Sequence, residues 1–316
     1  MPAVHIDLPP SVLATLSEYL EAVSVRYDAC MAHIEHNYTV DGVRAQIRLH
    51  YIRFDGNGRL KIEALAQALA SHITYYCISS KRRPKTFRLD EANDLFTEAR
   101  DYFRQSGTAG EPGELLLYFL LEAVLKVPQM VCKMELKTNR QDETKGADGI
   151  HLIYDAANDC LVVYLGEAKL IASYSQAMAS VFDSIARFHA NRQERHELKL
   201  VTKHFKAADP VLREEVSKYL DDQHPQGSCR IVHACLVGYD WDSYKELAGS
   251  KGAELIATFK DQYIRFFESR IKPKLDEHCA GFRDKSLEFE FFFLPFRSVQ
   301  EFRDEFLRII MGSAPS

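Results

Sequence analysis

The spacing of hydrophobic residues along the chain predicts both strands and helices. Some stretches alternate between apolar and polar residues, or form short apolar runs, as strands do. The expected strands are residues 38–54, 131–137, 149–154, 161–165, 230–237 and 287–294. Other stretches repeat apolar residues at helical spacing, at residues 62–78, 90–105, 114–126, 174–192, 211–220, 253–270 and 299–310. This order predicts a mixed α/β protein with a mixed central sheet flanked by helices.

A dense basic run, KRRPKTFR at residues 81–88, suggests a boundary within the chain. Such a run is either a solvated linker or a surface that contacts phosphates, and the sequence favours neither. We therefore expect a smaller N-terminal α/β region over residues 1–85, with an accessory or partner-binding role. Residues 86–316 would form the larger domain.

The segment at residues 145–169, KGADGIHLIYDAANDCLVVYLGEAK, organises the rest of the prediction. Two β-rich runs, 149–154 and 161–165, flank a stretch whose Asn and Asp side chains favour turns. We predict an antiparallel hairpin in which Asp155 pairs with Cys160. That pairing fixes the register of every residue along both strands.

In this register one face of the hairpin ends in two carboxylates. Apolar pairs come first along that face: Tyr154 with Leu161, Leu152 with Val163 and Ile150 with Leu165. Asp148 then faces Glu167, and Lys169 points the same way because side chains alternate along a strand. Facing carboxylates repel, and a divalent cation held by both would offset that repulsion most directly. The competing interpretation is structural, with Asp148 capping a turn and Glu167 pairing with Lys169.

The stretch at residues 114–126, ELLLYFLLEAVLK, is apolar nearly all round and predicts a helix buried on most sides. Glu114 lies in its first turn. Its carboxylate either complements the positive end of the helix dipole or is a third acidic group directed at the metal.

Composition and charge are those of a globular protein and exclude several classes. The formal net charge of −5 argues against a generally basic nucleic-acid binder, although local patches can still bind phosphates. No apolar run reaches membrane-spanning length and no secretory signal is evident, so we expect no membrane partner. The seven cysteines form no CxxC pair, which favours reduced thiols and a cytoplasmic location. No GxxxxGK[ST] motif occurs, so any ATP-driven step would need another chain.

Cations concentrate at the end of the expected helix 174–192 and just beyond it. They are Arg187, Arg192, Arg195, Lys199, Lys203 and Lys206, against Glu194 and Glu197 as the acidic residues of the same stretch. Lys and Arg side chains in such a series can follow a phosphate backbone. We therefore predict that DNA is contacted along residues 187–206, with residues 81–88 as the alternative patch.

The order of these charged residues resembles the active site of the PD-(D/E)XK nuclease superfamily. Glu114 opens a helix, Asp148 starts a strand and Glu167-Ala168-Lys169 ends the next, while Ala147 stands at a variable position where the superfamily name has proline. More narrowly, GELLLYFLLE, GADGIHL and LGEAKL are similar to the nuclease subunit of the Hachiman anti-phage defence system, over nearly the whole chain. The resemblance implies a restriction-endonuclease-like core and a bacterial DNA-degrading effector that works with a separate helicase subunit.

The resemblance also implies a role for each matching residue. Asp148 and Glu167 would bind Mg²⁺ or Mn²⁺, with the backbone carbonyl of Ala168 as a further ligand. Lys169 would position the attacking water and stabilise charge on the phosphate. Glu114 would bind a second ion or a water next to the metal. These residues form the expected catalytic and metal-binding set.

The expected function is metal-dependent hydrolysis of DNA phosphodiester bonds, together with or under the control of a helicase. Hard oxygen ligands suit Mg²⁺, and a lysine supplies positive charge where negative charge develops. Gln176 matches a helix position at which related nucleases place a polar contact beyond the metal ligands. Two alternatives stay open: a catalytically inactive module that binds DNA or holds the helicase, and an enzyme that acts on RNA or nucleotides. The choice between endo- and exonuclease action is also open.

Overall fold

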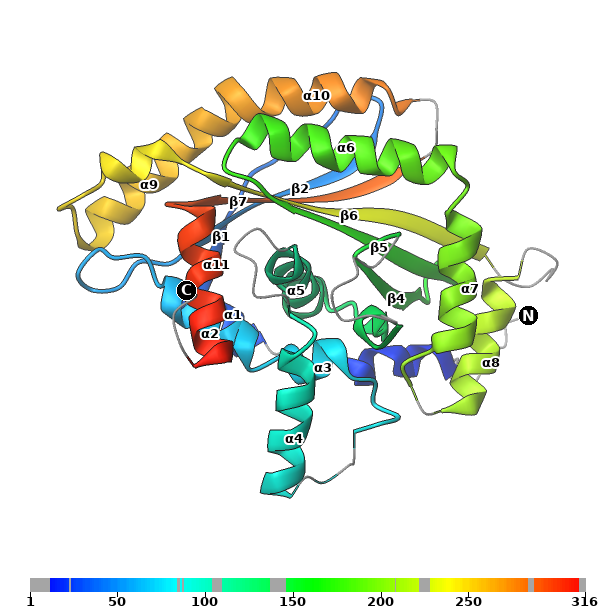
Figure 1. Ribbon diagram of the computed structural model, residues 1–316. Coiled ribbons are helices and arrows are strands. Elements are labelled where there is room, and N and C mark those ends of the chain that lie inside the picture. The colour runs from blue at the N-terminus through cyan, green and yellow to red at the C-terminus, as the bar shows by residue number, and fades with distance from the viewer. Residues whose placement is uncertain are drawn as a thin grey trace, which may run out of the picture.

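Within the part of the chain that the structure describes, seven strands form one mixed sheet (Figure 1). The computed structural model describes residues 12–22, 24–83, 86, 88–103, 110–136, 146–207, 209–221, 228–283 and 287–312. In spatial order the strands are β1 (Met31–Ile34), β2 (Arg44–Ile52), β7 (Glu288–Phe296), β6 (Ser228–Asp240), β5 (Cys160–Leu170), β4 (Gly149–Asp155) and β3 (Gln129–Val131). Neighbours from β2 to β5 in this order are parallel, and the outer pairs are antiparallel. The predicted mixed α/β fold, with helices flanking the sheet, is confirmed.

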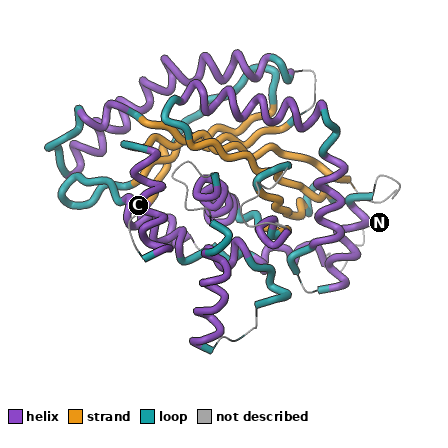
Figure 2. Tube along the Cα trace, viewed as in Figure 1, coloured by secondary structure: helices purple, strands orange, loops and turns teal. Residues whose placement is uncertain are grey.

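Helices cover both faces of this sheet (Figures 1 and 2). One layer contains α1 (Ser24–Cys30), α2 (Ile62–Ala70), α3 (Ile73–Cys77), α4 (Leu89–Arg100), α5 (Glu111–Leu120) and α11 (Val299–Met311). The other contains α6 (Tyr174–Ala190), α7 (Glu194–His204), α8 (Pro210–Tyr219), α9 (Gly252–Phe266) and α10 (Lys272–Ala280). Short 3₁₀ segments are η1 (Val12–Tyr19), η3 (Lys133–Leu136) and η4 (Asp242–Lys245), and π-helical segments are η2 (Leu121–Leu125) and η5 (Phe267–Ile271). No helix in the described ranges has both the length and the apolar character needed to cross a bilayer.

The strand β7 shows how the sheet separates two cores. Its sequence EFEFFFLPF is apolar on both faces, as expected for a strand covered on both sides. Phe291 and Phe293 face the core under α9 and α10, whereas Phe292 and Leu294 face the core under α2, α5 and α11. A third cluster fills the space between the β4–β5 hairpin and α6, α7, α8 and η1.

The β4–β5 hairpin has the predicted register. Asp155 pairs with Cys160 and Ile150 pairs with Leu165, with a continuous ladder between them. The apolar face of the hairpin contributes Ile150, Leu152 and Leu165 to the third core cluster. Helices therefore cover that face, which explains why its side chains are apolar up to the point where the carboxylates begin.

Two predicted elements differ from the structure. The expected strand 131–137 is reduced to β3, which ends at Val131, because the chain then turns through η3. There Lys133 points inward and Glu135 accepts a hydrogen bond from the Ser79 N–H at 2.9 Å. The expected helix 114–126 begins earlier, at Glu111, and changes into the π-helical segment η2 before Lys126 takes a left-handed conformation, with φ of 60°. Pro128 cannot extend the helix, which is consistent with its end here.

The N-terminal region lies in the same sheet as the rest of the chain. β2 is parallel to β7, with Arg44 opposite Glu288 and Leu49 opposite Phe293. Helices α1 and α2 share a core with α5 and α11. The boundary expected near residue 85 thus falls between elements that form one sheet and share one core.

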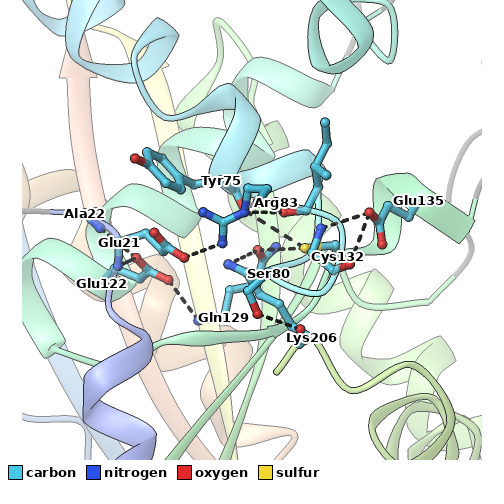
Figure 3. A network of polar contacts seen from close by, with 12 residues as sticks. Glu21, Ala22, Tyr75, Ser80, Arg83, Glu122, Gln129, Cys132, Glu135 and Lys206 are labelled. Atoms are coloured by element: carbon cyan, nitrogen blue, oxygen red, sulfur yellow. Dashed lines mark hydrogen bonds and ion pairs between the residues drawn. The ribbon is translucent and has the colours of Figure 1, made fainter. Parts of the chain in front are cut away.

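A buried carboxylate in η2 joins three of these segments (Figure 3). Glu122 is fully buried, and its oxygens accept hydrogen bonds from the N–H groups of Glu21 and Ala22, both at 2.8 Å, and of Gln129, at 2.9 Å. Burial raises the pKa of Glu122, while the buried Lys206 ammonium and the three N–H donors act in the opposite direction. Glu122 therefore satisfies two buried backbone donors and one partly buried donor.

We expect Glu122→Ala to lower the free energy of unfolding by about 3 kcal/mol or more, because it leaves two buried N–H donors and one partly buried donor without their acceptor. Urea unfolding followed by circular dichroism measures this. Glu18→Ala, at an exposed carboxylate, is the matched control and should change stability by less than about 0.5 kcal/mol. Equal effects from both variants would contradict the role given to Glu122.

Candidate functional site

Asp148 lies immediately before β4 and opposite the end of β5. Its N–H donates to the Gly166 carbonyl at 2.7 Å, and its Oδ2 accepts from the Ala168 N–H at 2.7 Å. Since Gly149 pairs with Gly166, Glu167 is the next residue on the β5 side. The hairpin thus fixes the Asp148 carboxylate against the backbone that carries Glu167, as the register predicts.

Lys169 follows on the same strand and forms an ion pair with Glu167. Its Nζ lies 2.7 Å from Oε1 of Glu167, and the two side chains are 29% and 13% exposed. The ammonium also faces the charge of Asp148. One cation therefore lies among the carboxylates of the hairpin end, and its contact with Glu167 is the pairing that the structural interpretation expects.

Glu114 approaches this group from the first turn of α5. Its Oε2 accepts a hydrogen bond from the Tyr76 hydroxyl at 3.2 Å. Gly113 allows the close approach of α5 to β5, because a Cβ at this position would lie 3.0 Å from Cγ of Leu170. The helix N-terminus and the strand end thus bring a third carboxylate to the site, as the resemblance predicts.

These residues line a cleft of about 380 Å³ between the N-terminus of α5, the end of the hairpin and the C-terminal part of α6. Its charged and polar lining includes Glu111, Glu114, Asp148, Glu167, Lys169, Ser184, Arg187, Asn191, Gln193 and His233. Ala168 also lines it. The predicted catalytic set therefore gathers at one concave surface, which is the usual shape of a binding site.

The electrostatics of the cleft are dominated by crowded acids. Burial raises the pKa of Asp148 well above its usual range, and the charges of Glu114 and Glu167 raise it further against the opposing effects of Lys169 and the Ala168 N–H. Burial lowers the pKa of Lys169, but the charges of Glu167, Asp148 and Glu114 outweigh it, so that the pKa is raised. In the absence of a cation the Asp148 carboxyl therefore holds a proton more tightly than an ordinary aspartate.

The donor set fits a hard divalent cation that keeps part of its hydration shell. Across the described ranges, no three His, Cys, Asp or Glu side chains converge closely enough to hold a metal ion unaided. Asp148 and Glu167 could supply two oxygen ligands, leaving the other positions to the Ala168 carbonyl, water or a phosphate. That incomplete protein coordination is how Mg²⁺ is commonly bound.

The predicted DNA-contacting residues lie on α6, on α7 and in the turn between these helices. Arg187 belongs to α6 and also lines the cleft, Arg192 follows in the turn, and Arg195, Lys199 and Lys203 lie on α7. All are exposed. Gln176, in the first turn of α6, is exposed as well, but it is not among the residues that line the cleft.

Two features of the predicted basic segment differ from expectation. Lys206 is only 1% exposed, so it cannot belong to a phosphate-binding surface; its N–H bonds to the Met130 carbonyl, which draws the chain inward after α7. Glu197 is fully buried, so it does not interrupt the exposed cations. In the alternative basic patch, Arg82 pairs with Glu98 and Arg83 with Glu21. The 187–203 surface, which includes Arg187, is thus the stronger candidate.

Sequence reasoning missed His233, which lines the cleft, and its neighbour His189. The Nε2 atoms of His189 and His233 lie 2.9 Å apart, and His189 Nδ1 contacts Glu194. Burial lowers the pKa of His233 to about 3, with a smaller effect from His189. His233 is the polar residue inside an apolar strand, RIVHACLV, which could have drawn attention to it. Its partner on α6 could not be read from the sequence.

Comparison with known proteins identifies a family. The family model described as HamA matches residues 28–310, which is most of the chain. The matched range contains all the elements from β1 onward that build the cleft. No curated protein matches the sequence.

In the cation-free protein we expect Asp148→Asn to raise the stability at neutral pH by about 1 kcal/mol or more. Because the folded-state pKa of Asp148 is raised, folding binds a proton above the unfolded pKa of about 4, and stability falls as pH rises through this range. The advantage of the variant should therefore be absent below about pH 4 and grow above it. Thermal melts in EDTA from pH 4 to 8 measure this.

Lys169→Ala should have the opposite effect in the same melts. The raised pKa of Lys169 means that its stabilising contribution is complete at neutral pH and is lost only as pH rises above its ordinary value. We expect a loss of about 1 kcal/mol at pH 7. If both substitutions destabilise the protein equally, the carboxylates are structural partners of Lys169 and not crowded acids.

Proposed function

The chain belongs to the HamA family of the Hachiman anti-phage defence system, and from this premise we propose that it is a metal-dependent nuclease that hydrolyses DNA phosphodiester bonds. Its role in defence follows from the family. We further propose that it acts together with, or under the control of, a helicase subunit, as the resemblance to the Hachiman nuclease subunit implies. The sequence contains no GxxxxGK[ST] motif, so another chain would supply any ATP-driven step.

One observation carries the proposal: three carboxylates and a lysine converge on the cleft at the end of the hairpin. Asp148 immediately precedes β4, Glu167 lies on the neighbouring strand β5, and Nζ of Lys169 lies 2.7 Å from Oε1 of Glu167. A fold needs no such concentration of like charge for its stability, since facing carboxylates destabilise a sheet. The arrangement is well suited to binding a cation and a phosphate together.

In this proposal the residues of the chain divide the chemistry among them. A bound Mg²⁺ or Mn²⁺ would polarise the phosphate and make a water molecule more acidic. Asp148 and Glu167 would hold that ion, and Asp148 would release its proton on doing so. Lys169, no longer needed to neutralise Glu167, would donate to a phosphate oxygen or hold the attacking water. Glu114, anchored by Tyr76, would orient a further water or ion.

The proposed substrate is a polymer, because the cations outside the cleft extend well beyond it. Arg187 lines the cleft, and the exposed residues Arg195, Lys199 and Lys203 continue along α7. A mononucleotide would not need this additional surface, whereas a nucleic-acid strand places a phosphate at every nucleotide. The choice of DNA over RNA rests on the family.

The proposal predicts that Asp148→Asn, Glu167→Gln and Lys169→Ala each lower DNA cleavage at least about 100-fold. Purified protein, with and without the helicase subunit, is incubated with labelled DNA or RNA in Mg²⁺ or EDTA. Asp159→Asn is the matched control, because this exposed carboxylate lies in the turn at the other end of the same hairpin. Mg²⁺ should also raise the melting temperature of the wild type and of Lys169→Ala, but not of Asp148→Asn.

Two results would contradict the proposal. If Asp148→Asn still cuts DNA, or if Mg²⁺ changes neither melting nor cleavage of the wild type, the site is not a metal centre. DNA binding without cleavage under every condition would favour the alternative of an inactive DNA-binding or scaffolding module. Selective cleavage of RNA would identify the other alternative.

We also expect neutralisation of Arg192, Arg195, Lys199 and Lys203 to glutamine to weaken DNA binding. The slope of log affinity against log salt should fall by about one unit for each phosphate that the protein no longer neutralises. Fluorescence anisotropy with a labelled duplex at several salt concentrations measures it. Replacement of Lys251, Arg265, Arg270 and Lys274, on and beside α9 and α10, is the charge-matched control. Unchanged binding by the α7 variant would eliminate this surface.

A further inference from the structure

A buried ion pair lies next to the candidate metal centre without belonging to it. Lys133 of η3 and Glu197 of α7 are 4% and 0% exposed, and Nζ lies 2.7 Å from Oε2. Taking both charges out of water is costly, and an apolar pair would fill the same space at least as well. The burial of these two charges therefore suggests a role other than stability.

The pair holds the backbone that leads into Asp148. Nζ of Lys133 donates to the carbonyl of Ala147. Gly146 has a φ of +92°, and a Cβ there would lie 1.9 Å from Oε1 of Glu197 and 3.3 Å from Nζ of Lys133. Glycine is thus required for the backbone to lie against the ion pair. The two residues before Asp148 are fixed by these charges, and Asp148 itself is fixed by its N–H bond to Gly166.

Glu197 connects this contact to the basic surface. It faces inward from α7, whereas Arg195, Lys199 and Lys203 face solvent from the same helix. Val201 anchors the helix in the core under the hairpin. If a ligand bound on the outer face of α7 shifted this helix, Glu197 would move with it. Through Lys133, that movement would reach the backbone at Gly146 and Ala147. Figure 1 shows α7 beside the β4–β5 hairpin.

We infer that the Lys133–Glu197 ion pair positions Asp148 and couples α7 to the candidate metal centre. Nucleic acid bound on the outer face of α7 then stabilises the arrangement of Asp148 that accepts a cation, and a cation at Asp148 strengthens nucleic-acid binding by the same factor. Lys133 and Glu197 are positioning residues in this scheme, since they act through the backbone of Ala147. The effect on cation binding rests on the proposed function, whereas the positioning of Asp148 can be tested without metal.

The test uses the double variant Lys133→Met/Glu197→Leu, which removes both charges and so avoids leaving a lone buried ion. Hydrogen exchange is measured in EDTA, with and without a short DNA duplex. We expect peptides covering residues 146–150 to exchange about tenfold faster in the variant, and peptides from β2 and β7 to be unchanged. In the wild type, DNA should slow exchange at residues 146–150. In the variant it should not.

The matched control is Glu21→Gln/Arg83→Met, which removes another largely buried ion pair that does not line the cleft (Figure 3). Although Arg83 belongs to residues 81–88, its side chain is only 7% exposed and so does not contribute to a DNA-contacting surface. It should retain the wild-type exchange at residues 146–150 and the response to DNA. In a cleavage assay the Mg²⁺ concentration at half-maximal rate should rise about tenfold in Lys133→Met/Glu197→Leu and stay constant in the control.

The outcomes separate this inference from the proposed function. Unchanged exchange at residues 146–150 in Lys133→Met/Glu197→Leu overturns the positioning role, whatever the cleavage assay shows. Faster exchange combined with an undiminished response to DNA overturns the coupling to α7. A wild type that neither binds Mg²⁺ nor cleaves DNA refutes the proposed function, and the exchange data still decide whether the pair holds Asp148.

Discussion

The repulsion between carboxylates at one end of a hairpin is the constraint on which the rest of the site depends. Two charges about 5 Å apart, the spacing of cross-strand neighbours, repel by roughly 3 kcal/mol at an effective dielectric of about 20. Three local features oppose this repulsion: the Lys169 ammonium, the Ala168 N–H that bonds to Asp148, and the raised pKa of Asp148, which favours its neutral form. Each of these features offsets less of the repulsion than a divalent cation bound by both carboxylates would. In the proposed function, a metal ion bound by Asp148 and Glu167 would replace these weaker interactions.

The surrounding fold makes that strained arrangement possible by fixing its backbone from several directions. β5 pairs with β4 from Cys160 to Gly166 and with β6 from Cys160 to Leu170, so the backbone of Glu167 and Lys169 is held by the ladder with β6. Gly113 lets α5 approach the end of β5 closely. The aromatic side chains of β7 and its helical neighbours bury both faces of the sheet. Burial of this apolar surface supplies the main stabilisation and offsets the local cost of crowding acids.

The sequence was sufficient to predict those parts of the site that depend on the spacing of residues within one segment. Period-two alternation and the Asp155–Cys160 turn determine the hairpin register, and the register alone brings Asp148 to Glu167. The sequence was insufficient wherever a contact joins distant segments. Lys206 looks like one more surface cation, and its burial depends on contact with β3. Glu197 likewise looks like an exposed residue of a charged segment. Its burial depends on an ion pair with Lys133, which lies far away in the sequence. The joining of residues 31–52 to the central sheet was missed for the same reason.

The separation of acidic and basic residues in this chain is consistent with the proposed binding of a polyanion by an acidic protein. Its net charge of −5 would repel nucleic acid at long range, and the acids of the cleft would repel a phosphate at short range. The exposed cations of α7 counter the first effect locally. A divalent cation at Asp148 would be needed to counter the second. In the proposed function, binding of the polymer and binding of the ion would each be incomplete without the other. A helix that carries Arg195 and Lys199 outward and Glu197 inward would link them.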